Sequence, residues 1–240
     1  MKYAILGDIH ANKEALEAVL KDAEEQGVTH FACTGDVVGY NADPKACLQI
    51  IRNLKCKIVQ GNHDYYAACN ESMDLFTPMA KKSIRWTRKQ LSLLERRFLQ
   101  KLPMIVDIEN FTLVHSSLNN PNRWNYIFKR KAADANFRNQ FNQVCFFGHT
   151  HVPLAFIKGT SIDKGFYEKL HVKAGFQYLI NVGSVGQPRD RNPKAAYVIY
   201  DLGEQTISMR RVDYDMETTQ KKIRSAGLPF RNALRLTHGR

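Results

Sequence analysis

The order of apolar and polar positions in the first sixty residues predicts short strands that alternate with amphipathic helices. Apolar runs at Lys2–Leu6, His30–Thr34 and Lys57–Gln60 are typical of buried strands. Apolar residues recurring every three or four positions predict a helix from Lys13 to about Gln26, and a second helix begins at Pro44 and runs to about Leu54. Strands separated by helices of this length indicate a parallel sheet with right-handed crossovers.

The rest of the chain predicts a less regular arrangement. Residues 65–101 have helical periodicity, the segments 104–108 and 111–115 predict a β-hairpin, and the polar residues 119–143 predict a surface excursion with a short helix. The pattern further predicts strands at 144–147, 154–158, 178–182, 196–201 and 206–212, followed by a helix at 215–226. Because no repeat or linker interrupts the pattern, we expect one domain over residues 1–240, with the segments at about 65–101 and 119–143 covering the site.

Composition narrows the class of protein. The chain has 240 residues, of which 44% are hydrophobic and 24% charged, as in ordinary globular domains, and no window is apolar enough to span a membrane. The five cysteines lack any Cys-x-x-Cys spacing and mostly lie in apolar runs, which favours reduced, buried thiols. The N-terminus enters the first strand without a signal-peptide pattern, so we expect a cytoplasmic protein.

The net charge of +12 favours an anionic partner without identifying it. Much of the charge lies in two stretches, residues 81–101 and 210–240. These stretches are interpreted either as solvated helix faces with a frayed tail or as a nucleic-acid surface. The second interpretation is not favoured, because no platform for stacking single-stranded bases accompanies the basic residues.

Side chains that can hold a metal ion occur in five short clusters, and nearly every cluster follows a predicted strand. The seven candidates are Asp8, His10, Asp36, Asn62, His115, His149 and His151. Oxygen and imidazole ligands that converge at the ends of parallel strands are typical of a two-metal hydrolytic site. Any one of these histidines alone could equally be a structural residue, so the prediction depends on the whole set.

Two of the clusters suggest individual roles. Asp36 lies in Gly-Asp-Val-Val-Gly, and its two carboxylate oxygens suit it to bridge two cations. In Gly-Asn-His-Asp, Asn62 offers a neutral oxygen ligand, and His63 is placed to reach substrate rather than metal. We expect Asp64 to accept a hydrogen bond from the His63 ring and so to orient a catalytic His63–Asp64 pair.

The five clusters together resemble the signature of the calcineurin-like metallophosphoesterases, which is Asp-x-His, Gly-Asp-x-x-Gly, Gly-Asn-His-Asp/Glu, a single His and Gly-His-x-His. Every element is present between Gly7 and His151. The opening Gly-Asp-Ile-His-Ala-Asn and the segment Gly183-Ser-Val-Gly-Gln-Pro-Arg-Asp190 are similar to the small single-domain prokaryotic branch. The resemblance implies a four-layer α/β/β/α sandwich of two mixed sheets flanked by helices.

The resemblance also implies which ligands share a metal. One cation would be held by Asp8, His10, Asp36 and His151, and the other by Asp36, Asn62, His115 and His149. The implied reaction is hydrolysis of a phosphomonoester or phosphodiester by in-line attack of a metal-bridging hydroxide, with His63 serving the leaving oxygen. Mixed oxygen and nitrogen ligands favour Mn²⁺, with Fe, Zn²⁺, Co²⁺ and Ni²⁺ as alternatives.

The substrate and the partners stay open. We expect a small phosphorylated molecule or nucleotide as substrate, bound by Asn62 and His63 and by Arg189, whose guanidinium could grip a phosphate oxygen or form a surface turn with Asp190. A metal-dependent nuclease is the alternative that the basic charge favours, and a metal-binding docking module without catalysis is a third. The oligomeric state cannot be read from the sequence.

Overall fold

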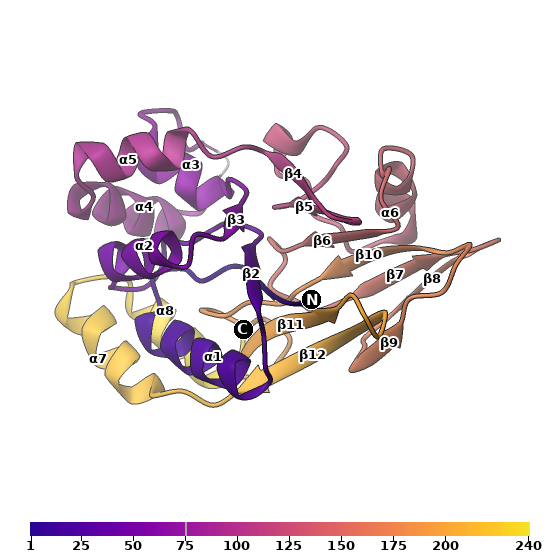
Figure 1. The fold of residues 1–240 in the computed structure, drawn as a ribbon. Helices are drawn as coiled ribbons and strands as arrows, with labels where there is room; N and C mark the ends of the chain where they lie inside the picture. Colours follow the sequence, from indigo (N-terminus) through magenta and orange to yellow (C-terminus); the bar gives the residue numbers. More distant parts are fainter. Residues whose placement is uncertain (75) are drawn as a thin grey trace.

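Two mixed β-sheets lie face to face between outer layers of helices in the computed structural model, which describes residues 1–74 and 76–240 (Figure 1). Each sheet has six strands. The first has the order β3 (Lys57–Ile58), β2 (His30–Cys33), β1 (Lys2–Leu6), β11 (Ala195–Asp201), β12 (Thr206–Val212) and β9 (Lys169–His171). The second has the order β4 (Ile105–Ile108), β5 (Phe111–Val114), β6 (Val144–Phe147), β10 (Gln177–Asn181), β7 (Ala155–Lys158) and β8 (Ile162–Gly165).

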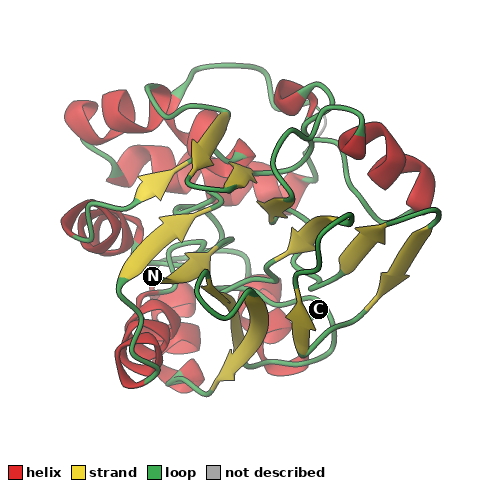
Figure 2. Ribbon diagram, turned by 45° about the vertical axis from the view of Figure 1, so that its right-hand side comes forward, coloured by secondary structure: helices red, strands yellow, loops and turns green. Residues whose placement is uncertain are grey.

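The described helices pack outside these sheets, as Figure 2 shows with strands in the centre and helices toward the outside. They are α1 (Lys13–Glu25), α2 (Pro44–Asn53), α3 (Asn62–Ala68), α4 (Pro78–Gln90), α5 (Leu93–Gln100), α6 (Arg130–Phe137), α7 (Met216–Ser225) and α8 (Phe230–His238). A single 3₁₀ turn covers Pro121–Arg123. The four-layer sandwich implied by the sequence resemblance is confirmed.

The predicted parallel strands are confirmed, and they bring the motif loops to one edge. β1 pairs in parallel with β2, and β2 with β3, while β6 pairs in parallel with both β5 and β10 in the other sheet. The β4–β5 hairpin is antiparallel, as predicted. Because parallel strands end at the same edge of a sheet, the loops that follow them gather in one place.

One layer of the core lies between the two sheets. Ile5 and Tyr200 of the first sheet pack with Phe111 and Phe146 of the second, and these four side chains are buried. A second apolar layer, including Leu16 of α1, fills the space between helices and the outer face of the first sheet. Burial of each large apolar side chain contributes roughly 1.5–3 kcal/mol, so the layers hold the loops at their edge firmly.

Three elements were not predicted from the sequence. β8 and β9 are short, mostly exposed strands without apolar alternation, and α8 has only Asn232, Ala233 and Leu236 buried. The segment of α8 is amphipathic, so its periodicity was present in the sequence and was missed. The C-terminal residues 230–238 are therefore a packed helix and not a frayed tail.

The structure bears on the expectations about membrane-spanning segments and about the cysteines. No helix among residues 1–74 and 76–240 is long and apolar enough to cross a membrane. All five cysteines are free, with Cys33, Cys47 and Cys145 buried and Cys56 and Cys69 partly buried.

One partly buried charge cluster ties α1 to the neighbouring sheet. The Asp22 carboxylate accepts hydrogen bonds from the Arg210 guanidinium at 2.6 and 3.0 Å and from the Tyr197 hydroxyl at 2.6 Å. Burial alone would raise the pKa of Asp22, but these hydrogen bonds outweigh it and lower the pKa below its usual value. Arg210, one of the basic residues in the 210–240 stretch, thus has a structural role.

We predict that Asp22→Asn lowers the free energy of unfolding by about 1–2 kcal/mol at neutral pH, since a partly buried charge-assisted cluster loses its acceptor charge. Because the pKa of Asp22 is lowered in the folded state, its stabilisation is present at neutral pH and is lost as the pH falls through that lowered pKa. Urea unfolding of the wild type and the variant over a pH series measures this. The exposed Glu24→Gln on the same helix is the control, and an equal loss in both variants would contradict the prediction.

Candidate metal centre

The seven candidate ligands predicted from the sequence all lie at one edge of the sandwich and are buried. They come from the loops after β1, β2, β5 and β6 and from the start of α3, and their exposed fractions range from 0% to 7%. Residues separated by up to 143 positions in the chain, from Asp8 to His151, are thereby placed side by side. The structure therefore brings together every residue that the sequence analysis assigned to the metal site.

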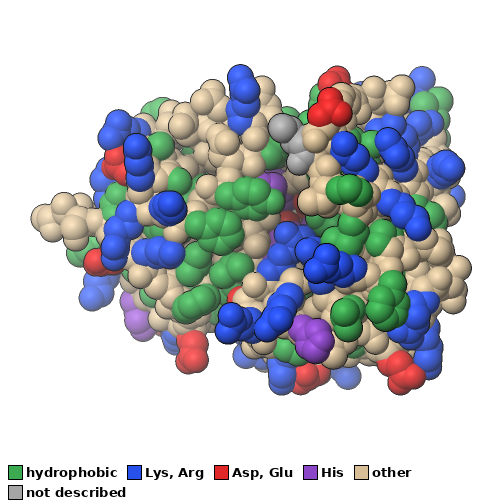
Figure 3. All heavy atoms as spheres, turned by 180° about the vertical axis from the view of Figure 1, so that it is seen from behind, with side chains coloured by type: hydrophobic (Ala, Val, Ile, Leu, Met, Phe, Trp, Pro, Cys, Tyr) green, Lys and Arg blue, Asp and Glu red, His purple; other side chains and the backbone are tan. Residues whose placement is uncertain are grey.

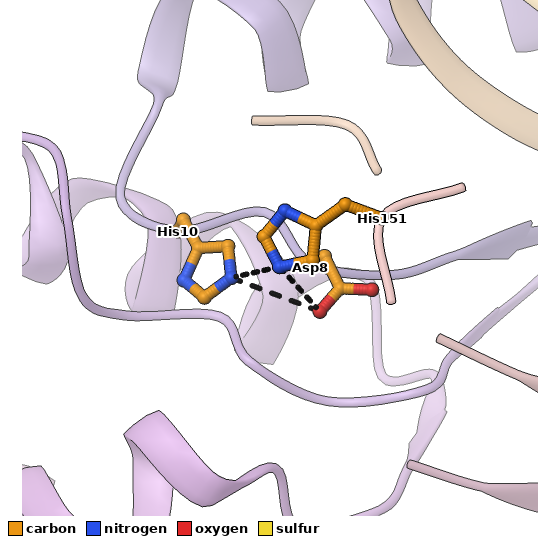
Figure 4. A group of neighbouring side chains, drawn as sticks. All are labelled: Asp8, His10 and His151. Atoms are coloured by element: carbon orange, nitrogen blue, oxygen red, sulfur yellow. Dashed lines mark hydrogen bonds and ion pairs between the residues drawn. The ribbon is translucent and has the colours of Figure 1, made fainter. Parts of the chain in front are cut away.

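The first group consists of Asp8, His10 and His151, which converge from three directions (Figure 4). The Nε2 atoms of His10 and His151 are 3.0 Å apart. Asp8 Oδ1 lies 3.7 Å from the first of these nitrogens and 3.4 Å from the second. One oxygen and two nitrogens thus surround a common point at distances that suit a shared cation.

Backbone carbonyls fix which imidazole nitrogen carries the hydrogen. The Nδ1 atoms of His10, His115 and His151 lie 3.1, 2.8 and 2.6 Å from the carbonyl oxygens of Val38, Thr34 and Gln187 respectively. A carbonyl can only accept, so each Nδ1 must donate, and each Nε2 therefore presents a lone pair to the centre. These carbonyls were missed from the sequence, although Thr34 and Val38 flank Asp36 in its motif.

A second group forms around His115. Its Nε2 lies 3.0 Å from Asn62 Oδ1 and 3.2 Å from His149 Nδ1. Asp36 Oδ2 stands between the two groups, 3.5 Å from His10 Nε2 and 3.4 Å from His115 Nε2. Asp36 is therefore placed where a carboxylate could bridge two cations, as the sequence analysis expected.

The chemistry of these donors fits divalent cations. Asp8 Oδ1, Asp36 Oδ2 and His149 Nε2 are buried without a hydrogen-bond partner among the described residues. Burial is the main factor that raises the pKa of Asp8 to about 6 and lowers the pKa of His10, His149 and His151 well below the usual value. Neutral imidazoles and costly buried carboxylates are both stabilised by a bound cation, which supplies the charge that the site lacks.

The backbone at these positions is held in an uncommon conformation. Asp8, His10, Asp36, His149 and His151 all have φ between 48° and 66°, the left-handed region that non-glycine residues rarely occupy. Such strain persists only where the surrounding structure enforces it, and it is concentrated at functional sites. Here a dense network enforces it, including the His149 N–H, which donates to Asp8 Oδ2 at 2.8 Å.

The structure corrects the expected pairing of His63 with Asp64. Asp64 accepts hydrogen bonds from the backbone N–H groups of Asp36, Gly61 and Val38 at 2.8, 3.2 and 3.2 Å, and His63 Nδ1 is buried without a partner. The physical reason is that these N–H groups surround the carboxylate and use its acceptor capacity. Asp64 therefore positions the loop that carries Asp36 and does not orient the His63 ring.

His63 is instead held by close packing. Its backbone N–H donates to Asp36 Oδ1 at 2.8 Å, and its ring contacts the His10 and Tyr40 rings at centroid distances of 4.8 and 4.4 Å. A Cβ on Gly39 would approach His63 Nδ1 to 2.5 Å, so only glycine fits there. His63 thus lies beside both ligand groups, with its ring at the wall of a pocket.

That pocket, of about 330 Å³, opens directly onto the ligand groups. Its lining includes Asp36, Asn62, His63 and Arg189 from the predicted site, together with residues of both segments that were expected to cover it. The Arg189 guanidinium lies 5.4 Å above the Tyr40 ring and donates to Gln187 Oε1 at 2.8 Å. Arg189 therefore belongs to the site and does not form a surface turn with Asp190, which contacts Arg211 instead.

Comparisons with known proteins agree with this geometry. The model of the calcineurin-like phosphoesterase superfamily domain matches residues 1–205. An uncharacterized protein of Methanocaldococcus jannaschii is 37% identical over 243 residues, covering 99% of this chain and 98% of the relative. A crystal structure of a metallophosphoesterase from Sphaerobacter thermophilus has a TM-score of 0.89 at 36% identity, covering 100% of this chain and 99% of that one. A hypothetical protein from Pyrococcus horikoshii shares the fold, with a TM-score of 0.82 at 20% identity over 100% of this chain and 98% of that one.

We predict that Mn²⁺ stabilises the chelator-treated protein. A cation at a hundred times its dissociation constant adds about 2.7 kcal/mol per site, which corresponds to a rise in Tm of roughly 5–10 °C for a domain of this size. Asp36→Asn should lose most of this rise, because an amide cannot bridge two cations. Thermal unfolding with and without Mn²⁺ measures both effects.

The exposed His238→Gln is the matched control and should keep the full rise. Without metal, Asp36→Asn should be no less stable than the wild type, because burial and the nearby Asp64 and Asp8 carboxylates raise the pKa of Asp36 and make its charge costly. The same Mn²⁺-induced shift in Asp36→Asn and in wild type would contradict the assignment.

Proposed function

The chain belongs to the calcineurin-like phosphoesterase superfamily, and we propose that it is a phosphoesterase that uses two divalent cations to hydrolyse a small phosphorylated molecule. The observation that carries this proposal is the convergence of the Nε2 lone pairs of three histidines on Asp8 Oδ1 and Asp36 Oδ2, which have no hydrogen-bond partner among the described residues, beside a pocket that Asp36 lines. The 36% identical Sphaerobacter thermophilus protein, whose structure is described as a metallophosphoesterase, adds support at the level of the family.

Two sets of residues would hold the cations. Asp8, His10 and His151 would hold one, Asn62, His115 and His149 the other, with Asp36 shared between them. Mn²⁺ is the ion that we favour, because mixed carboxylate and imidazole ligands suit it, as they do Fe, Zn²⁺, Co²⁺ and Ni²⁺. Bound divalent cations would lower the pKa of water to supply a nucleophile near neutral pH and would neutralise charge on phosphoryl oxygens.

His63 and Arg189 would act on the substrate from the pocket walls. Burial, with nearby positive charge, lowers the pKa of His63 well below the usual value, so its ring is neutral and donates a hydrogen bond from one nitrogen. Directed at the leaving oxygen, that donor would stabilise the charge that develops as the ester bond breaks. Arg189 would bind a phosphoryl oxygen, and Asn62 would contact the same group from the metal side.

The size of the pocket favours a small molecule over a nucleic-acid duplex. At about 330 Å³ it suits a ligand of nucleotide size, and Arg210 from one of the two basic stretches is committed to Asp22. A docking module without catalysis is disfavoured because the whole ligand set and His63 lie in place. Whether the ester is a monoester or a diester depends on the outer part of the pocket.

We predict that His63→Ala lowers kcat on p-nitrophenyl phosphate by roughly 10²–10⁴-fold, because a positioned proton donor or hydrogen-bond donor at the leaving oxygen is lost. The variant should bind the same number of Mn²⁺ ions as the wild type, measured by elemental analysis of the desalted protein. The reason is that His63 contacts the ligands without being needed to complete either set.

His115→Ala is the comparison variant, and it should lose both metal and activity, since His115 Nε2 faces Asp36, Asn62 and His149. The pattern separates a residue that acts on substrate from one that holds metal. Turnover by His63→Ala close to that of the wild type would contradict the proposed role of His63.

A further inference from the structure

The outer part of the pocket carries positive charge that the metal centre does not explain. Arg123, Arg189 and Arg235 line it, whereas Asp36, at its floor, is the only acidic residue in the lining. No ion pair within 4.0 Å involves any of these three arginines among the described residues. Figure 3 shows this face, where Lys and Arg side chains and hydrophobic side chains gather around a hollow in which histidine is visible.

Two of these arginines lie close enough to repel each other. Burial is the main factor that lowers the pKa of Arg235, and the charge of Arg189 lowers it further. Arg189 Nε is buried without a hydrogen-bond partner among the described residues. Two half-buried guanidinium groups that face one pocket, neither of them within 4.0 Å of a carboxylate among the described residues, are a costly arrangement, and a bound anion would offset that cost.

Arg235 is placed there by a rigid anchor. It lies on α8, one turn after Asn232, so both side chains emerge on the same side of the helix. Asn232 is fully buried, and its side-chain amide donates to the Tyr40 carbonyl at 2.8 Å and to Ser83 Oγ at 3.0 Å. The end of α8 is tied down as well, because the Arg191 N–H donates to the Gly239 carbonyl at 2.8 Å.

Arg235 lies outside the part of the chain that the superfamily domain matches. The superfamily domain matches residues 1–205, which include every candidate metal ligand, His63 and Arg189. Arg235 reaches the same pocket from a helix beyond that range. A residue that lies outside a common reaction centre is well placed to select among substrates that share the reacting group.

Aromatic side chains form the remaining walls. Tyr126 stacks on the His149 ring at a centroid distance of 4.3 Å and an interplanar angle of 22°, yet 55% of its surface is exposed. Trp124 and Phe76 also line the pocket. Exposed aromatic faces next to arginines are suited to a planar ring that carries negative charge, as in a nucleotide.

We propose that Arg235, with Arg189, forms a second anion subsite, so that the substrate is a nucleotide-like phosphoester with a further phosphate beside the one at the metal centre. The inference rests on the proposed function, because it takes the metal centre as the place where the first phosphate binds. It makes Arg235 a specificity-determining residue, and the aromatic walls the contact for the planar ring.

The test measures binding and not turnover. Isothermal titration calorimetry of the Mn²⁺-loaded protein, at matched free Mn²⁺ in cell and syringe, compares AMP with the α,β-methylene analogue of ADP. The ratio of the two dissociation constants reports the second phosphate. We expect the wild type to prefer the ADP analogue by about tenfold or more, the effect of a charge-assisted hydrogen bond.

Arg235→Gln should reduce this ratio to within about threefold of unity, and Arg235→Lys should give an intermediate ratio because it keeps the charge and loses the planar fork. The exposed Arg231→Gln on the same helix should keep the wild-type ratio. A wild type without preference, failure of both nucleotides to bind, or an unchanged ratio in Arg235→Gln would each overturn the inference. A preference that depends on Arg235 in a protein without metal-dependent phosphoesterase turnover would uphold the subsite and refute the proposed function.

Discussion

The rest of this structure depends on the orientation of three buried imidazoles, those of His10, His115 and His151. Their Nε2 lone pairs point toward the buried carboxylates of Asp8 and Asp36. The carbonyls of Val38, Thr34 and Gln187 fix those lone pairs, because each can only accept a hydrogen bond from Nδ1. Without a cation this arrangement is unfavourable, because the Nε2 lone pairs of His10 and His151 face each other at 3.0 Å. In addition, Asp8 Oδ1 and Asp36 Oδ2 have no hydrogen-bond partner among the described residues. The positive φ angles of five ligand residues are part of the same constraint, which the packed sheets sustain.

The molecule divides into a reaction centre and an outer pocket that are built by different elements. Ligands from the ends of β1, β2, β5 and β6 would act on any phosphoester, because they address only the phosphorus centre. The segment with Trp124 and Tyr126, and the helix with Arg235, line the pocket beyond that centre. Selectivity in this account is therefore a property of peripheral elements that the core holds in place.

The residues of the metal centre were more predictable from the sequence than those of the outer pocket. Nearly every ligand cluster follows a strand with a clear apolar pattern, so the convergence of Asp8, Asp36 and His115 at strand ends could be predicted from the sequence. Arg235 could not, because its position depends on the tertiary anchor of Asn232 to Tyr40, between residues 192 positions apart. The expected His63–Asp64 pair was wrong for a related reason, since adjacency in sequence gave no sign of the three N–H groups around Asp64.

The central claim is that this site holds two cations that share Asp36. Anomalous diffraction from crystals grown with Mn²⁺, recorded on both sides of the manganese absorption edge, tests it most directly. We predict two anomalous peaks about 3.5–4 Å apart, one beside Asp8 and His151 and the other beside His115, with Asp36 between them. A single peak at full manganese occupancy, or peaks away from these residues, would contradict the account.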